Sequence, residues 1–200
     1  MKRIVLIGFL LGWSLGPPHC LAAELPGQAV RQAHNYLHVR ELTGRNDHPD
    51  IDRFLGYLGL PKGLSWCAAY VLYSYKEAAD ELRMRQPLPR YGRVARLASV
   101  CKSNPLKYRW ITTDEVRFGS VRLQPGDMPM WANGRIRSGD FDGHIGLGLQ
   151  QLSPVKIRTI EGNTSSGNKG SQREGNGVFI RERAINPGSF RIIGFCRVRT

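Results

Sequence analysis

The spacing of apolar residues changes partway along this chain of 200 residues, and that change constrains the fold more than any other feature. Up to about residue 104, apolar residues recur at helical intervals, whereas from about residue 108 short β-prone segments alternate with Gly, Pro, Asn and Asp. Helices followed by strands indicate an α+β fold with an antiparallel sheet, here of about five to six strands. We expect one domain over residues 24–200, with a helical part at about 28–104 and a sheet part at about 108–199.

Four segments in the first half are predicted to be helical. The first covers residues 28–42, and the second follows in "DHPDIDRFLGYLG", with Asp47 or His48 as its N-cap. The third starts in "LSWCAAYVLYSYKEAADEL", where Ser65 is the expected N-cap and Cys67 therefore falls in the first turn. A fourth helix is indicated by "RVARLASVCK".

The first 23 residues have the pattern of a signal peptide. Lys2 and Arg3 precede the apolar run "IVLIGFLLGWSLG", and small residues offer a cleavage site near Ala22 or Ala23. Cys20 is an alternative site for lipid attachment, but the residues before it are not the small ones such a site usually carries. Since no later segment approaches about 20 apolar residues, we expect a periplasmic or secreted protein without stable membrane insertion.

The chain is strongly basic. Its formal net charge is +13, and removal of Lys2 and Arg3 with the signal peptide leaves +11. The basic residues are scattered, and no nucleic-acid-binding motif is present, so nucleic acid is not the expected partner. An exported basic protein is expected to meet anionic polymers of the cell envelope, although an alkaline surface without a dedicated partner fits the composition equally well.

Three cysteines remain after signal removal, and an odd count leaves one thiol unpaired. The simplest arrangement is a Cys101–Cys196 disulfide with Cys67 free, although the sequence does not establish the pairing. From its type alone, Cys67 is a small buried residue, half of a disulfide or a nucleophile. Its place in the first turn of a helix favours the last, because unpaired backbone N–H groups and the helix dipole stabilise a thiolate.

A thiol nucleophile needs a base, and His144 is the strongest candidate. His34 and His38 lie one turn apart on the first helix, and His48 starts the second, so surface or capping roles explain them. His144 instead opens the predicted strand "HIGLGL" directly after the Gly- and Asp-rich loop "NGRIRSGDFDG". That loop and a second one, "GNTSSGNKGSQREGNG", are either ordinary hairpin loops or mobile borders of a binding site.

The following strand supplies a partner for the base. Glu161 and Asn163 in "KIRTIEGNTS" are two residues apart, so strand alternation places both side chains on one face. A carboxylate or an amide at that position can accept the imidazole N–H and fix the orientation of the ring. A polar strand end that leads into a turn is the simpler alternative.

In this order the motifs resemble the CHAP family (cysteine, histidine-dependent amidohydrolase/peptidase), part of the group that includes the NlpC-type cell-wall peptidases. The matching motifs are "WCAAYV", "LQPGD", "GHIGLGL" and "IEGN", and the resemblance covers residues 48–199. It implies a papain-like fold, Cys67 as nucleophile, His144 as general base and later acid, and Glu161 with Asn163 as orienting groups. It also implies a substrate, the amide bonds of peptidoglycan, cleaved by an endopeptidase or an N-acetylmuramoyl-L-alanine amidase.

Several questions stay open at the level of sequence. An acyl transferase on the same scaffold and a noncatalytic envelope-binding module are the alternatives, and an inhibitor or immunity protein is a possible partner. Some CHAP proteins bind calcium through closely spaced aspartates, but Asp47, Asp50 and Asp52 lie in a segment expected to be helical, so no metal and no cofactor are predicted. The stretch "RQPLPRYGRVARLASVCKSNPLKYRWITTDEVRFGSVR" matches nothing in the family, which makes it a candidate for substrate choice. No substrate-binding residue is assigned.

Overall fold

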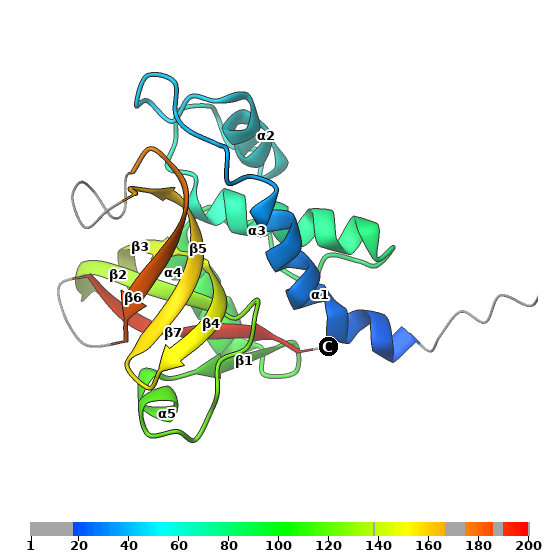
Figure 1. Ribbon diagram of the computed structural model, residues 1–200, viewed down its shortest axis with the longest axis vertical. Helices are drawn as coiled ribbons and strands as arrows, with labels where there is room; N and C mark the ends of the chain where they lie inside the picture. The colour runs from blue at the N-terminus through cyan, green and yellow to red at the C-terminus, as the bar shows by residue number, and fades with distance from the viewer. Residues whose placement is uncertain (1–17, 138, 167–174, 186–189, 200) are drawn as a thin grey trace, which may run out of the picture.

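A computed structural model of the chain describes residues 18–137, 139–166, 175–185 and 190–199. These residues form an α+β fold in which helices come first and strands come last (Figure 1), which confirms the predicted fold class. Residues 1–17, most of the predicted signal peptide, lie outside the described part. Within that part no helix is both long and apolar enough to cross a bilayer.

Five helices and seven strands are present in the described residues. The helices are α1 (Pro18–His34), α2 (Pro49–Tyr57), α3 (Cys67–Glu81), α4 (Val94–Ser103) and α5 (Thr113–Arg117). The strands are β1 (Tyr108–Ile111), β2 (Met128–Arg137), β3 (Asp140–Ile145), β4 (Leu147–Ser153), β5 (Lys156–Thr164), β6 (Gly177–Ala184) and β7 (Phe190–Val198).

The strands form two antiparallel sheets, with orders β1-β7-β2-β3 and β4-β5-β6, where one sheet of five to six strands was expected. The predicted strand "HIGLGL" is divided, because β3 ends at Ile145 and β4 begins at Leu147 in the other sheet. Gly146 lies at the crossing, where an added Cβ would stand 2.6 Å from Cγ of Glu161. Only glycine lets the chain change sheets this close to that side chain.

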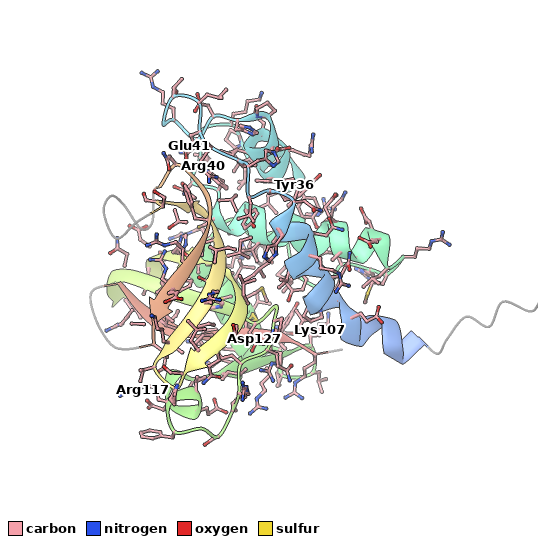
Figure 2. All side chains as sticks on the ribbon, in the orientation of Figure 1. Tyr36, Arg40, Glu41, Lys107, Arg117 and Asp127 are labelled. Carbon is pink, nitrogen blue, oxygen red and sulfur yellow. A yellow bond between two sulfur atoms is a disulfide. The ribbon has the colours of Figure 1, made fainter. Side chains whose placement is uncertain are left out.

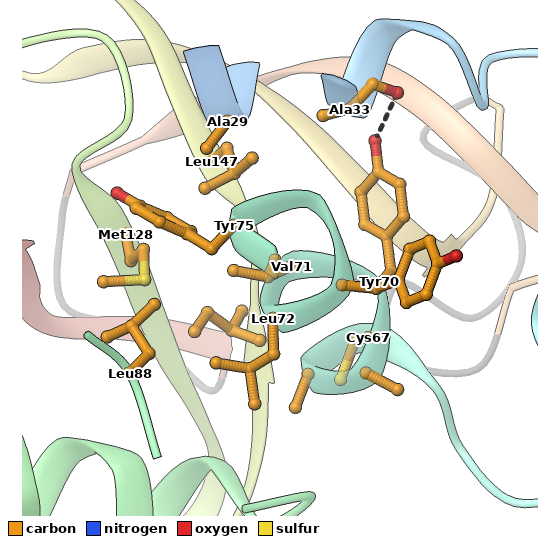
Figure 3. Packing of buried hydrophobic residues seen from close by; sticks show 14 of the residues in the cluster. Ala29, Ala33, Cys67, Tyr70, Val71, Leu72, Tyr75, Leu88, Met128 and Leu147 are labelled. Atoms are coloured by element: carbon orange, nitrogen blue, oxygen red, sulfur yellow. Dashed lines mark hydrogen bonds between the residues drawn. The ribbon is translucent and has the colours of Figure 1, made fainter. Parts of the chain in front are cut away.

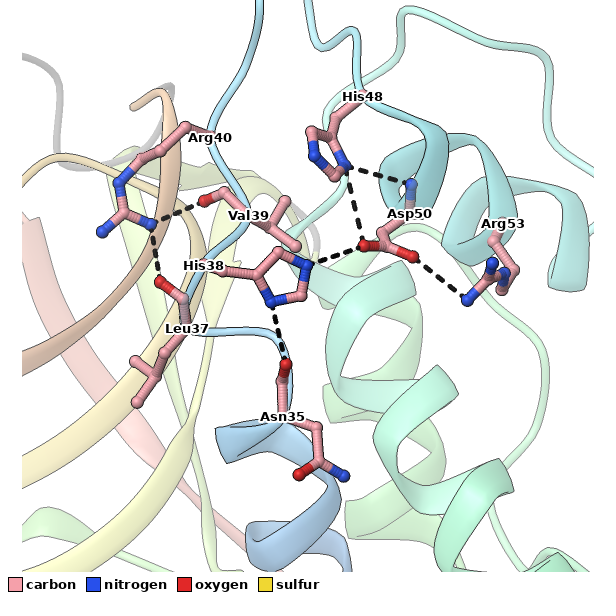
Figure 4. Close-up of polar contacts among 8 residues, drawn as sticks. All are labelled: Asn35, Leu37, His38, Val39, Arg40, His48, Asp50 and Arg53. Atoms are coloured by element: carbon pink, nitrogen blue, oxygen red, sulfur yellow. Dashed lines mark hydrogen bonds and ion pairs between the residues drawn. The ribbon is translucent and has the colours of Figure 1, made fainter.

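The first helix differs from the prediction at its C-terminal end. It ends at His34 and not at residue 42, because the chain beyond it pairs with the edge of β6. Val178 donates its backbone N–H to the carbonyl oxygen of Val39 (3.1 Å), and the Arg40 guanidinium bonds the Leu37 carbonyl oxygen (2.9 Å; Figure 4). At its other end α1 runs through the expected cleavage site, and the signal peptide stays a prediction.

Helix α3 forms the centre of the larger hydrophobic core. Figure 3 shows Val71, Leu72 and Tyr75 on this helix among other buried apolar side chains, with Cys67 at its N-terminal end. The helix lies close to β5, since a Cβ at Gly162 would be 2.6 Å from the Trp66 ring. This close approach brings the start of α3 beside the strand that carries the predicted orienting residues.

The starts of α2 and α3 test two predicted caps. His48 caps α2 as expected, accepting the backbone N–H of Asp50 at its Nδ1 (3.1 Å). Ser65 does not cap α3, because Trp66 occupies the N-cap position and no side-chain cap hydrogen bond is present. Cys67 is nevertheless the first residue of α3, so its predicted place in the first turn is confirmed.

A disulfide joins Cys101 on α4 to Cys196 on β7 across 95 residues of sequence, and Cys67 is free. The pairing that seemed simplest is therefore confirmed. Of the two Gly-rich loops, "NGRIRSGDFDG" mostly forms the ends of β2 and β3, so it is a strand pair and not a long loop. Half of the second loop, residues 167–174, lies outside the described residues.

Candidate active site

Cys67 is almost buried but borders an open cavity. Its exposed fraction is 5%, and the adjoining cavity has a volume of about 140 Å³. The cavity lies between the start of α3, the start of α4 and the end of β3, and its lining residues are Ser65, Cys67, Gly92, Arg93, Val94, Phe141, Asp142 and Gly143. A small group can therefore approach the sulfur from outside while most of the side chain stays packed.

His144 faces Cys67 from β3, and its ring is fixed from behind by Glu161 on β5. The imidazole Nε2 lies 2.9 Å from Oε2 of Glu161, and both side chains are fully buried. Because Nε2 is engaged by the carboxylate, Nδ1 is the nitrogen left to act on the thiol of Cys67. Three residues from α3, β3 and β5, far apart in sequence, thus form one contiguous array.

The Glu161 carboxylate is held by more than the histidine. Arg183 on β6 donates from Nε to Oε1 (2.8 Å) and from Nη2 to Oε2, and the Thr159 hydroxyl donates to Oε1 at 2.5 Å. Arg183 also donates to the hydroxyl of Thr164 (3.1 Å). A two-pronged guanidinium contact fixes both the charge and the rotation of the carboxylate, so Arg183 and Thr159 determine where Glu161 can hold the imidazole.

The electrostatics of the array favour a charged pair. Burial alone would lower the pKa of His144, but hydrogen bonds to Cys67 and Glu161 outweigh it and raise the pKa to about 9. Burial would raise the pKa of Glu161, but hydrogen bonds from Arg183 and His144 lower it to about 2. Near neutral pH the arrangement therefore holds an imidazolium between the Glu161 carboxylate and the sulfur of Cys67.

Asn163 is close to this array in sequence but makes no hydrogen bond to it. Its side chain is fully buried, and neither amide atom has a hydrogen-bond partner among the described residues. Its backbone has a φ of 58°, and the pairing of β5 with β6 shifts register between Glu161 and Thr164. The shift removes the strict alternation that was expected to place Asn163 beside Glu161.

The other histidines have structural contacts, as their positions suggested. His34 Nδ1 bonds the carbonyl oxygen of Val30 (2.8 Å), and His38 Nε2 lies 3.2 Å from Oδ2 of Asp50. His48 contacts the same carboxylate at 3.7 Å, and Figure 4 shows the two imidazoles on either side of Asp50. None of these contacts involves the Cys67 array.

The three aspartates considered for calcium are bound to protein groups. Asp47 accepts from the backbone and hydroxyl of Thr43, Asp50 contacts Arg53 (3.1 Å), and Asp52 contacts Lys62 (2.7 Å). In the described part of the chain no group of three or more His, Cys, Asp or Glu side chains is arranged to hold a metal.

Sequence reasoning missed Thr159 and Arg183, and for Trp131 it left a core position and a substrate-stacking position as equal alternatives. Trp131, fully buried on β2, is the cross-strand partner of His144, with ring centroids 5.5 Å apart, and the Arg183 guanidinium lies 5.8 Å from the centre of its ring. The sequence signal for Arg183 was weak, because the alternation in "FIRER" normally places charged residues on the solvent face of the strand. In this protein the strand instead buries Arg181 and Arg183 and leaves Ile180 44% exposed.

Comparison with known proteins does not assign this chain to a family. No protein-family model matches the sequence, and no curated protein is significantly similar to it.

Proposed function

We propose that this protein is an exported thiol hydrolase that cleaves amide bonds of peptidoglycan, on a papain-like scaffold similar to that of the CHAP family. The observation that carries the proposal is the Cys67, His144 and Glu161 array, in which Nε2 of the histidine lies 2.9 Å from the carboxylate while the free cysteine contacts the same ring. This is the arrangement of nucleophile, base and orienting group that acyl transfer through a thiol requires.

In the proposed first step the Cys67 thiolate attacks the carbonyl carbon of the scissile amide. The S–C bond forms and the carbonyl π electrons move to oxygen, giving a tetrahedral oxyanion. Backbone N–H groups in the first turn of α3 stabilise that oxyanion, since no side chain caps this helix start. His144 then gives its proton to the departing amine as the C–N bond breaks, leaving a thioester on Cys67.

In the second step His144 acts as base on water. The water oxygen attacks the thioester, His144 takes its proton, and the S–C bond breaks to release the acid and restore the thiolate. Glu161 stays ionised throughout and holds the imidazole through Nε2, because Arg183 and Thr159 fix its position. The orienting role expected for a Glu161 and Asn163 pair is assigned here to Glu161, whose carboxylate bonds Nε2 of the ring.

The substrate assignment rests on charge and export. The predicted mature protein carries +11 and follows a signal peptide, which suits the anionic polymer of the cell wall. The family resemblance points to the same polymer.

The deciding experiment is digestion of purified peptidoglycan by the mature protein and by a Cys67→Ala variant, with fragments identified by mass spectrometry. New amine termini or free stem peptides from the unmodified protein alone would establish the activity and identify the bond. A His144→Gln variant should be equally inactive, whereas His34→Gln, which changes an exposed histidine, should keep full activity.

Fragments released equally by Cys67→Ala would contradict a thiol mechanism. No fragments from any variant, with wall binding intact, would favour the noncatalytic envelope-binding module. Transfer of the acyl group to an added amine, in place of water, would identify an acyl transferase.

A further inference from the structure

Basic side chains face each other across two neighbouring strands at the edge of the four-stranded sheet. The register of β1 and β7 pairs Arg109 with Arg197, and one step further Arg199 donates its backbone N–H to Lys107 (2.8 Å). Arg109 and Arg197 are direct cross-strand partners and share a face, while Lys107 and Arg199 lie just beyond the ends of β1 and β7. These four residues are called the basic quartet. Like charges directly opposite each other destabilise a sheet, so sheet stability does not explain the quartet.

Among the described residues, two members of the quartet have carboxylate partners and two do not. Arg197 donates from Nε and Nη2 to the buried Asp127 of the "LQPGD" motif, each at 2.7 Å, and Arg109 lies 3.3 Å from Glu115. Arg199 donates only to the Tyr108 carbonyl oxygen (3.4 Å), and within the described residues the Lys107 amino group has no hydrogen bond or ion pair. Figure 2 labels Lys107 beside the C-terminal end of β7. Two adjacent cations are thus left for a partner outside the chain.

Two cavities adjoin the quartet. One, of about 540 Å³, is lined by Arg109, Arg197 and Arg199 beside the turn that carries Asp127. The other, of about 660 Å³, is lined by Lys107 and Arg199 together with the apolar or basic side chains Arg85, Pro87, Leu88, Pro89, Tyr91, Val100 and Leu106. Arg199 borders both cavities, so together they suit an extended ligand with several anionic groups better than a single small ion.

The second cavity and the cavity beside Cys67 are lined by consecutive residues of the chain. Tyr91 lines the former, while the next two residues, Gly92 and Arg93, line the latter. Both cavities are therefore bordered by the stretch of chain, from residue 85 to 122, that resembled nothing in the family.

We propose that the basic quartet and its two cavities form a docking site for the carboxylates of peptidoglycan stem peptides. This inference rests on the proposed function, because it names the place where the same substrate polymer is held. Guanidinium groups bind carboxylates through two parallel hydrogen bonds. Each exposed contact is weak, about 0.2–1 kcal/mol, but a polymer that repeats the anion engages several sites at once and raises the effective affinity.

The test measures binding without cleavage. All proteins carry Cys67→Ala, and their co-sedimentation with purified peptidoglycan gives the affinity. A Lys107→Gln/Arg199→Gln pair should weaken binding about fivefold or more, through loss of two contacts of this size in a multivalent complex. The matched control, Arg53→Gln/Lys62→Gln, removes the same charge from exposed side chains around α2 and should bind within about twofold of the parent.

A second arm changes the polymer. Peptidoglycan whose carboxylates have been coupled to ethanolamine is uncharged at those positions, and the parent protein should bind it as weakly as the quartet variant binds native polymer. Thermal unfolding of every variant establishes that each is folded. Equal weakening by the quartet and control pairs, or undiminished binding to the coupled polymer, would overturn the docking site.

The two proposals fail separately. Binding that depends on both the quartet and the carboxylates, with no Cys67-dependent fragments from the protein that retains Cys67, would support the docking site and contradict the hydrolase. Cys67-dependent fragments, with binding indifferent to the quartet, would support the hydrolase and overturn the docking site.

Discussion

Two groups of charged residues in this protein are built in opposite ways. Inside the fold, Glu161 is fully buried and accepts hydrogen bonds from His144, Arg183 and Thr159, so its charge is compensated by named partners. At the β1–β7 edge, Lys107 faces Arg199 and neither is paired with a carboxylate in the described residues. An unpaired charge strongly destabilises a folded protein when it is buried, but it changes the stability little when it is exposed to water. The charges of the inner group are thus compensated within the chain, whereas the outer group presents two cations without a carboxylate partner in the described residues.

The largest expected effect follows from removing the inner negative charge. Glu161→Gln keeps the side-chain shape but not the charge that stabilises the imidazolium, so kcat on peptidoglycan should fall by about 10⁴-fold, the cost of the equivalent change in a Ser-His-Asp site. The rate at which iodoacetamide alkylates Cys67, the free thiol, should fall in the same variant.

Asn163→Gly is the matched control for that change. The residue has a φ of 58°, which glycine adopts freely, and its amide atoms have no hydrogen-bond partner among the described residues. The rate of Cys67 alkylation should therefore change by less than about tenfold, which corresponds to less than about 1.4 kcal/mol in the activation free energy. An effect as large as that of Glu161→Gln would show that Asn163 shares the orienting role.

The same substitution made in both regions sharpens the contrast in stability. Arg183→Met strips a buried carboxylate of its two-pronged partner and should cost about 3–5 kcal/mol in the free energy of unfolding. Arg199→Met removes an exposed cation and should change it by no more than about 0.5 kcal/mol. Urea unfolding of the two variants gives both values. Similar losses would mean that the buried Arg183–Glu161 pair stabilises the fold no more than the exposed Arg199 does.

Arg183→Lys separates charge from geometry. The lysine restores the positive charge but not the two parallel hydrogen bonds. We expect it to recover part of the stability while the pH dependence of Cys67 alkylation stays altered, because a single donor does not fix the rotation of Glu161. Full recovery of both would show that charge alone is sufficient.

The pH dependence follows from His144. Its pKa in the folded protein, about 9, exceeds the ordinary value of 6.5, so the stability contributed by the imidazolium is complete below pH 6.5 and is lost as the pH rises through 9. Activity should fall about tenfold per pH unit above that value, because the leaving amine loses its proton donor. Glu161 has the opposite sign, and its contribution is lost only as the pH falls from 4.5 through about 2.

The Cys67→Ala variant tests the cause of that shift. Hydrogen bonding and charge from Cys67 raise the pKa of His144, so the variant should titrate its imidazole at lower pH, as measured by NMR. An unchanged titration would mean that Glu161 alone supports the imidazolium. His34, which is exposed and distant from this array, provides an internal reference in the same spectra.

The sequence predicted the parts of the fold that local patterns determine. The α+β class and the place of Cys67 in the first turn of α3 followed from spacing. His48 was one of two expected caps, and the Cys101–Cys196 disulfide was the simplest of the pairings that counting left open. What it could not predict depends on distant contacts. Residues 35–42 were expected to be helical, but β6 offers backbone partners to Val39 and Arg40, and the division at Gly146 depends on how closely Glu161 approaches.

The residues of the candidate site likewise divide into those that local patterns predicted and those that depend on distant contacts. Cys67, His144 and Glu161 carry recognisable chemistry at informative positions, and the fold brings these three side chains together. Arg183 was invisible because an arginine in an alternating strand normally faces water, and only the partner carboxylate explains its burial. The place of Asn163 beside Glu161 could not be predicted, because the register shift in β5 breaks the alternation on which that expectation depended.

The smallest expected effect follows from reversing the charge of one residue in the outer group. Lys107→Glu converts a like-charge pair with Arg199 into an opposite-charge pair, which should stabilise the fold by about 0.2–1 kcal/mol at low ionic strength and by less at about 1 M salt. The same change should weaken peptidoglycan binding, because it replaces a cation that the docking site offers with an anion. A variant that is more stable and binds less tightly is the expected outcome in parallel unfolding and sedimentation assays. Loss of stability would mean that Lys107 already stabilises the fold, and it would contradict the view that the quartet serves to bind a partner.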